Sequence, residues 1–248
     1  MVVHRKGYPM SDVLRLCLVG ATGLVGGKVL EACVGREDVR IQAVARREAN
    51  LPHGIRIEYF VADPAKWGEI FEALRPKAVI CALGTTWKKA GEDEAAFRAV
   101  DQDLVLQTAH AALDNGVERF VHISSVGADP VSKTFYLRVK GEVERDLTRL
   151  RFNRLDILRP GLLVGSRDND RRTAERLGIA ASPIANLFMH GKYRQYRGID
   201  AELVAKAALS LAKRAARIRF TDAAVRPLSR RRGGILARPR HRSIPRHH

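Results

Sequence analysis

A glycine turn near the N-terminus constrains the fold of this chain more than any other feature. The apolar run of residues 13–19 leads directly into Gly20-Ala21-Thr22-Gly23-Leu24-Val25-Gly26, and residues 28–34 are predicted to continue as a helix. A buried strand, a tight turn and a helix N-terminus form a cradle for a diphosphate, because backbone N–H groups and the positive end of the helix dipole point at the anion. The turn therefore predicts a dinucleotide site, with a purely structural turn as the alternative.

Each glycine of this Gly-x-x-Gly-x-x-Gly spacing has an expected role. Gly20 lets the chain turn, Gly23 lets a pyrophosphate approach the backbone, and Gly26 lets the helix pack against its strand. The spacing differs from the Gly-x-Gly-x-x-Gly of dehydrogenases that bind NAD in a separate domain. All positions from Gly20 to Gly26 are predicted to bind the cofactor.

The rest of the chain alternates strands with helices. Short apolar strands are predicted at residues 41–45, 55–62, 78–82, 117–123 and 153–158. Helices are predicted at residues 67–74, 92–115, 131–150 and 201–214. This alternation implies right-handed crossovers and a doubly wound parallel sheet, an α/β fold of the NAD(P)-binding Rossmann type.

One domain is predicted over residues 11–222, followed by a tail over residues 223–248. Residues 164–200 lose the alternation and are predicted to form a small substrate lobe, because later loops at the carboxyl ends of such strands cover the ligand. The net charge is +17, but residues 226–248 hold eight arginines and no acidic residue. This tail lacks apolar periodicity and is expected to be disordered, so nucleic acid is disfavoured as a partner.

The location and the remaining partners follow from composition. Cys17, Cys33 and Cys81 lie in apolar segments without metal-ligand spacing, which favours a reducing, cytoplasmic compartment and no metal site. No run reaches the ~18 apolar residues of a membrane-spanning helix, so no membrane partner is expected. A small-molecule substrate is expected, and the oligomeric state is left open.

Arg46 and Arg47 follow the second predicted strand and indicate the cofactor. An enzyme that prefers NAD places a carboxylate there on the adenosine ribose, whereas a pair of guanidinium groups binds a 2′-phosphate. The sequence therefore favours NADP(H), with two solvated arginines as the alternative. Asp63 is predicted either to bind the adenine amino group or to cap a helix. After the fourth strand, cofactor contacts are expected from Leu83, Gly84 and Thr85.

Tyr136 and Lys140 are the predicted catalytic pair. On a helix, residues four apart share a face, and an ammonium beside a phenol favours the phenolate. Such a phenol suits proton transfer to a carbonyl oxygen that receives a hydride, or from an alcohol that loses one. Ser124 and Ser125, at the end of the preceding strand, are predicted to polarise the substrate oxygen. An ordinary surface pair on an amphipathic helix is the alternative.

These motifs resemble the short-chain dehydrogenase/reductase superfamily, in its atypical single-domain branch. The nearer resemblance is to the oxidoreductases typified by the human 30-kDa Tat-interacting protein and its bacterial relatives. The matching segments are Gly20-Ala21-Thr22-Gly23, Arg46-Arg47, Cys81-Ala82-Leu83-Gly84-Thr85-Thr86, Ser124-Ser125, Tyr136-Leu137-Arg138-Val139-Lys140-Gly141-Glu142-Val143-Glu144 and Arg159-Pro160-Gly161.

The resemblance implies an NADPH-binding Rossmann fold in which Tyr136 donates or accepts the proton and Lys140 binds the nicotinamide ribose. It makes Ser125 the better of the two serines, and it places Leu163 and Arg171 near the nicotinamide. The expected function is NADPH-dependent turnover of a small carbonyl or alcohol. The alternative is an NADP(H)-sensing regulator that binds a protein partner without turnover.

Overall fold

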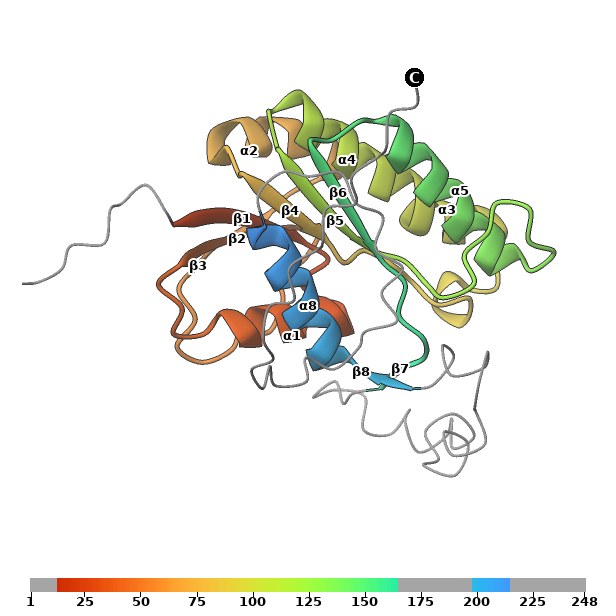
Figure 1. The fold of residues 1–248 in the computed structure, drawn as a ribbon, viewed down its shortest axis with the longest axis horizontal. Coiled ribbons are helices and arrows are strands. Elements are labelled where there is room, and N and C mark those ends of the chain that lie inside the picture. The colour runs from red at the N-terminus through yellow and green to blue at the C-terminus, as the bar shows by residue number, and fades with distance from the viewer. Residues whose placement is uncertain (1–12, 165–197, 215–248) are drawn as a thin grey trace, which may run out of the picture.

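A computed structural model describes residues 13–164 and 198–214 of the chain (Figure 1). Most of the predicted substrate lobe, the arginine-rich tail and Arg171 lie outside the described residues. Within the described part, no helix is long and apolar enough to cross a membrane.

Six strands form one parallel sheet in the order β3-β2-β1-β4-β5-β6. This order is that of a doubly wound Rossmann sheet. Strands β1 to β3 are added toward one edge of such a sheet and β4 to β6 toward the other, and ligands bind at the switch point between β1 and β4. The α/β prediction is confirmed. The strands are β1 (Leu14–Val19), β2 (Val39–Ala45), β3 (Ile57–Val61), β4 (Ala78–Cys81), β5 (Arg119–Ile123) and β6 (Arg154–Leu158).

Helices cover both faces of the sheet, as Figure 1 shows. One face carries α1 (Leu24–Cys33) and α8 (Ala201–Lys213), which pack against each other. The other carries α2 (Trp67–Leu74), α4 (Leu104–Asp114) and α5 (Phe135–Arg149). Each face has its own apolar core, so the central strands β1 and β4 are buried on both sides and are mostly apolar in sequence.

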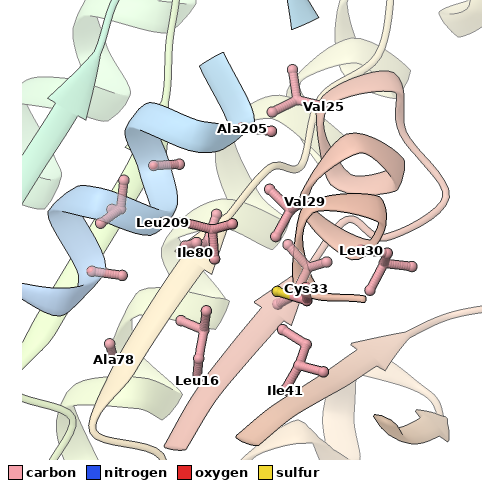
Figure 2. Close-up of a cluster of buried hydrophobic side chains, with 14 of the residues drawn as sticks. Leu16, Val25, Val29, Leu30, Cys33, Ile41, Ala78, Ile80, Ala205 and Leu209 are labelled. Atoms are coloured by element: carbon pink, nitrogen blue, oxygen red, sulfur yellow. The ribbon is translucent and has the colours of Figure 1, made fainter. Parts of the chain in front are cut away.

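The α1 and α8 face is closed by small and branched side chains. Figure 2 shows Val29 of α1 and Leu209 of α8 over Leu16 of β1 and Ile80 of β4. All four are buried. On the opposite face the largest buried side chains are aromatic: Trp67, Phe71 and Phe120. This packing fixes the N-terminal end of α1 against the strand that precedes it.

The helix expected over residues 92–115 is divided into three parts. An α-helix, α3 (Glu94–Arg98), leads into a π-helical turn, η3 (Ala99–Asp103), and then into α4. The prediction of one regular helix was wrong at this turn. A π-helical turn inserts an extra residue into the helix, and such turns are frequent at functional sites. Here it contains Asp101, a fully buried carboxylate.

Two very short strands were not predicted. β7 (Leu163–Val164) pairs in parallel with β8 (Ile199–Asp200), directly before α8. Two residues are too few to show any period of alternation, so the sequence carries no signal for this pair. The pairing places Leu163 beside Ile199 and Val164 beside Asp200.

Candidate functional site

The glycine turn connects β1 to α1 in a conformation that only glycine adopts easily. Gly20 has a φ of +94°, and a Cβ atom there would lie 2.5 Å from the carbonyl carbon and oxygen of Ala82. Gly23 is the N-cap of α1, and its N–H donates to the Gly20 carbonyl at 3.0 Å. The turn therefore sits directly against the end of β4, at the carboxyl edge of the sheet.

Gly26 lets α1 approach this turn closely. A Cβ atom at this position would lie 2.1 Å from the Gly20 carbonyl oxygen and 2.9 Å from the Ala21 Cα atom. Both contacts are with backbone, which cannot move aside as a side chain can. The N-terminus of α1 is thus held against the turn. Its first N–H groups face the position that a diphosphate would occupy.

A cleft opens beside the turn, over the carboxyl ends of β1, β2 and β4. Arg46 and Arg47 are both exposed, and neither forms an ion pair with a carboxylate of the described residues. The two guanidinium groups give the cleft an excess of positive charge. The cleft is lined by Gly20, Thr22, Val44, Ala45, Arg46, Arg47, Trp67 and Leu83.

Asp63, predicted as either an adenine ligand or a helix cap, forms the cap. Its Oδ1 atom accepts from the Ala65 N–H at 2.8 Å and begins a 3₁₀ turn, η1 (Pro64–Lys66). Beneath it, Trp67 is buried and donates its ring N–H to the Ala62 carbonyl at 3.2 Å. Of this segment, Trp67 lines the cleft. Of the two residues that the resemblance placed near the nicotinamide, Leu163 is half-buried on β7.

Lys140 is buried and paired with a carboxylate that the sequence analysis missed. Its Nζ atom lies 2.7 Å from Asp101 Oδ1, and the two side chains are 4% and 0% exposed. The other carboxylate oxygen accepts from the Thr85 N–H at 2.6 Å. Asp101 falls on the apolar stripe of its helix, in step with Phe97 and Val105. A charged residue on the apolar stripe of a helix is the sequence signal that could have identified Asp101.

The loop after β4 covers this ion pair. A Cβ atom at Gly84 would lie 3.5 Å from Asp101 Oδ1 and 3.8 Å from Lys140 Nζ. Burial by itself lowers the pKa of Lys140, but the Asp101 carboxylate and Tyr136 together raise that pKa above its usual value. Lys140 therefore keeps its positive charge although it is out of contact with water.

Tyr136 lies beside this ammonium on the same face of α5. Lys140 Nζ is 6.0 Å from the centre of the Tyr136 ring. The ring is half-buried and packs edge-to-face on Phe97, with centroids 5.7 Å apart. Phe97 also contacts Phe135 and Trp87, and Trp87 remains 38% exposed. The phenol is thus held between a cation and an aromatic cluster.

The two serines at the end of β5 have different surroundings. The buried Ser124 hydroxyl donates to Glu144 Oε1 at 2.5 Å, and Glu144 is paired with Arg159. Ser124 is therefore engaged with this ion pair. Ser125 is half-buried, and among the described residues its hydroxyl makes one long contact, of 3.3 Å, to the Val126 carbonyl. Of the pair, Ser125 is the one whose hydroxyl is available to a ligand.

Gly141, in α5, lets the helix pack closely against the loop that follows Ser125. A Cβ atom there would lie 2.2 Å from the Asp129 carbonyl carbon and from the Pro130 nitrogen. The Asp129 N–H also donates to the Leu137 carbonyl at 3.1 Å. These contacts fix the loop that follows Ser125 against the helix that carries Tyr136.

Curated relatives share most of this chain. It is 38% identical over 159 residues to "Protein FMP52, mitochondrial" of Saccharomyces cerevisiae, an alignment that covers 63% of this chain and 68% of the relative. The corresponding Emericella nidulans protein is 33% identical over 202 residues, with 79% and 85% covered. The names of these relatives contradict the expected cytoplasmic location. That expectation rested on buried cysteines, which report reducing conditions and not a particular compartment.

Solved structures share the fold at low sequence identity. The Thermus thermophilus UDP-glucose 4-epimerase, solved with NAD, has a TM-score of 0.62 at 16% identity, covering 84% of this chain and 77% of that one. The Bordetella bronchiseptica enzyme WbmH, solved with NAD⁺, has a TM-score of 0.60 at 14% identity, with 84% and 75% covered. A model of an NAD(P)H-binding family matches residues 20–185. The chain belongs to this NAD(P)H-binding family.

Proposed function

We propose that this protein is an NADPH-dependent oxidoreductase of the short-chain dehydrogenase/reductase type, acting on a small carbonyl or alcohol. The observation that carries the proposal is the placement of Tyr136 beside the buried, charged Lys140, next to the loop after β4. A pair on an ordinary surface helix would leave the lysine in water. Here the ammonium is buried, and its field acts on the phenol in a medium of lower dielectric constant.

The described residues fit a phosphorylated dinucleotide. There is no room for a Cβ atom at Gly20 or Gly26, so the turn and the start of α1 pack together through backbone alone. A diphosphate is favoured at such a helix N-terminus. Arg46 and Arg47 supply positive charge in the adjacent cleft, which favours a 2′-phosphate and hence NADP(H) over NAD(H). When bound, the nicotinamide ring supplies or accepts a hydride.

The residues around that ring would each have a distinct task. Tyr136 donates a proton to the substrate oxygen during reduction and takes it back during oxidation. Lys140 stabilises the phenolate and holds the ribose. Ser125 donates a hydrogen bond that orients the substrate oxygen. The proposed substrate lobe of residues 164–200 fits this arrangement, because β7 and β8 bring its ends together next to α8.

Removing both cleft arginines tests the cofactor preference. The double substitution Arg46→Ala and Arg47→Ala should raise the Kd for NADPH about 100-fold or more, because each charge-assisted hydrogen bond contributes about 1.5–3 kcal/mol. The Kd for NADH should change only a few-fold. Fluorescence titration of both cofactors measures the two constants. Arg56→Ala, an exposed arginine outside the cleft, is the control. Equal losses for NADPH and NADH would contradict the preference for a 2′-phosphate.

The two serines provide a second test. Ser125→Ala should lower kcat about 10²–10³-fold, as expected when a donor to the reacting oxygen is lost, and should leave the melting temperature nearly unchanged. Ser124→Ala should instead destabilise the fold by about 1.5–3 kcal/mol, because its partner is a buried charged carboxylate. Calorimetry and a panel of aldehydes and ketones with NADPH separate the two effects. The reverse pattern would assign the catalytic role to Ser124.

A further inference from the structure

A buried ion pair lies directly beneath the proposed active site. Asp101 is completely buried, Lys140 is 4% exposed, and their charged atoms are 2.7 Å apart. They come from different elements, since Asp101 is on the π-helical turn η3 and Lys140 is in the middle of α5. Two charges removed from water at this distance are strongly coupled, so each depends on the other to remain charged.

The backbone around Asp101 is arranged to hold its carboxylate in place. The Thr85 N–H donates to the second carboxylate oxygen at 2.6 Å, which ties Asp101 to the loop after β4. Gly84, in the same loop, has no side chain, and a Cβ atom there would contact both members of the pair. The π-helical turn supplies the extra residue that brings Asp101 to this position.

We propose that Asp101 is a positioning residue: its carboxylate is the buried counter-ion that holds the Lys140 ammonium beneath the loop after β4 and beside Tyr136. The pairing itself is independent of the proposed function. Only the consequence for Tyr136 rests on that function. A neutral side chain of the same shape would keep the hydrogen bond to Thr85 but would leave the Lys140 charge without compensation.

The other titratable groups that face Lys140 cannot replace Asp101. Tyr136 is on the same helix, Cys81 is on β4 and His122 is on β5. Burial raises the pKa of the Cys81 thiol to about 12, and burial together with Lys140 lowers the pKa of His122 to about 3. Both are neutral at pH 7. Among the described residues, Asp101 is therefore the carboxylate that balances this charge.

A double-mutant cycle on stability tests the pair without any assay of activity. The variants are Asp101→Asn, Lys140→Met and the two combined, with Asp103→Asn as the matched control on the exposed side of the same turn. Asp101→Asn should lower the urea midpoint by about 1 M at pH 7, because removing one partner leaves a buried charge unpaired. The combined variant should lose much less than the sum of the single variants. Asp103→Asn should match the wild type.

The effect of pH distinguishes a lost charge from general damage. In Asp101→Asn, burial without a counter-ion lowers the folded-state pKa of Lys140 below its unfolded value. Stability is then recovered as the pH rises from 7 to 10 and the lysine loses its proton. In the wild type the Lys140 pKa is raised, so its contribution is present at pH 7 and is lost only above the unfolded pKa. The gap between the two urea midpoints should therefore narrow toward pH 10.

Two outcomes would overturn the proposal. One is a gap in urea midpoint that stays constant between pH 7 and pH 10. The other is a combined variant as unstable as the sum of the single variants, including the case in which neither it nor Asp101→Asn folds. The consequence for Tyr136 is measured separately, as a shift of the basic limb of the kcat profile to lower pH in Asp101→Asn, with NADPH and the aldehyde panel. If the wild type shows no turnover, the proposed function fails and the stability cycle still decides the pairing.

Discussion

Replacing Tyr136 with phenylalanine is expected to lower kcat about 10²–10⁴-fold and to leave the Kd for NADPH within a few-fold of the wild-type value. The substitution removes only the hydroxyl group. The ring still packs on Phe97, and Lys140 still pairs with Asp101, so the fold and the cofactor cleft are retained. Steady-state rates with NADPH and a panel of aldehydes and ketones measure the first quantity. Fluorescence titration of NADPH measures the second.

Tyr59→Phe is the matched control for this substitution. Tyr59 is on β3, and its hydroxyl donates to the carbonyl of Arg47, a residue that lines the cleft, at 2.9 Å. Losing that hydroxyl should leave kcat unchanged and should alter NADPH binding modestly. A Tyr136→Phe variant that keeps kcat within about tenfold of wild type would remove the phenol from the mechanism. If the wild type binds NADPH but reduces none of the carbonyls, the alternative of an NADP(H)-sensing regulator without turnover would be favoured.

The sheet was predictable because its strands are buried on both faces. A doubly covered parallel strand appears as a mostly apolar run: β4 is apolar throughout, and β1 and β2 are interrupted only by Arg15, Arg40 and Gln42. The glycine turn was predictable for a related reason. At Gly20 and Gly26 any side chain would collide with backbone, and at Gly23 a Cβ atom would be crowded at 3.2 Å from the Gly20 carbonyl oxygen, so the sequence has a strong local constraint there.

The separate roles of the site residues were less predictable, because they depend on contacts between segments that are distant in sequence. Ser124 and Ser125 are neighbours in sequence, and the hydrogen bond that engages Ser124 is accepted by Glu144 on α5, twenty residues further along the chain. Asp101 forms its contacts with residues of another helix and of a loop. The residues around Asp101 carry no sequence signal for a π-helical turn, so the spacing of apolar residues indicated one continuous helix.

Substituting Gly26 with alanine is expected to lower the free energy of unfolding by about 2–4 kcal/mol. The added methyl group would lie 2.1 Å from the Gly20 carbonyl oxygen, so either α1 or the turn must move. The helix cannot shift without cost, because its buried face packs against α8 (Figure 2). Chemical denaturation measures the loss. NADPH binding should weaken as well, since the N–H groups at the start of α1 would no longer face the diphosphate.

Gly27→Ala separates this close approach from the general effect of replacing a helical glycine. Gly27 is the next residue of the same helix, and a Cβ atom there meets nothing within 4 Å. Alanine should therefore stabilise the protein by about 0.5–1 kcal/mol, because glycine loses more conformational freedom in a helix. The two substitutions add the same atoms one residue apart, and they should change the free energy of unfolding in opposite directions. If both stabilise the protein, α1 does not rest on the glycine turn, and the cradle for the diphosphate is not built as described.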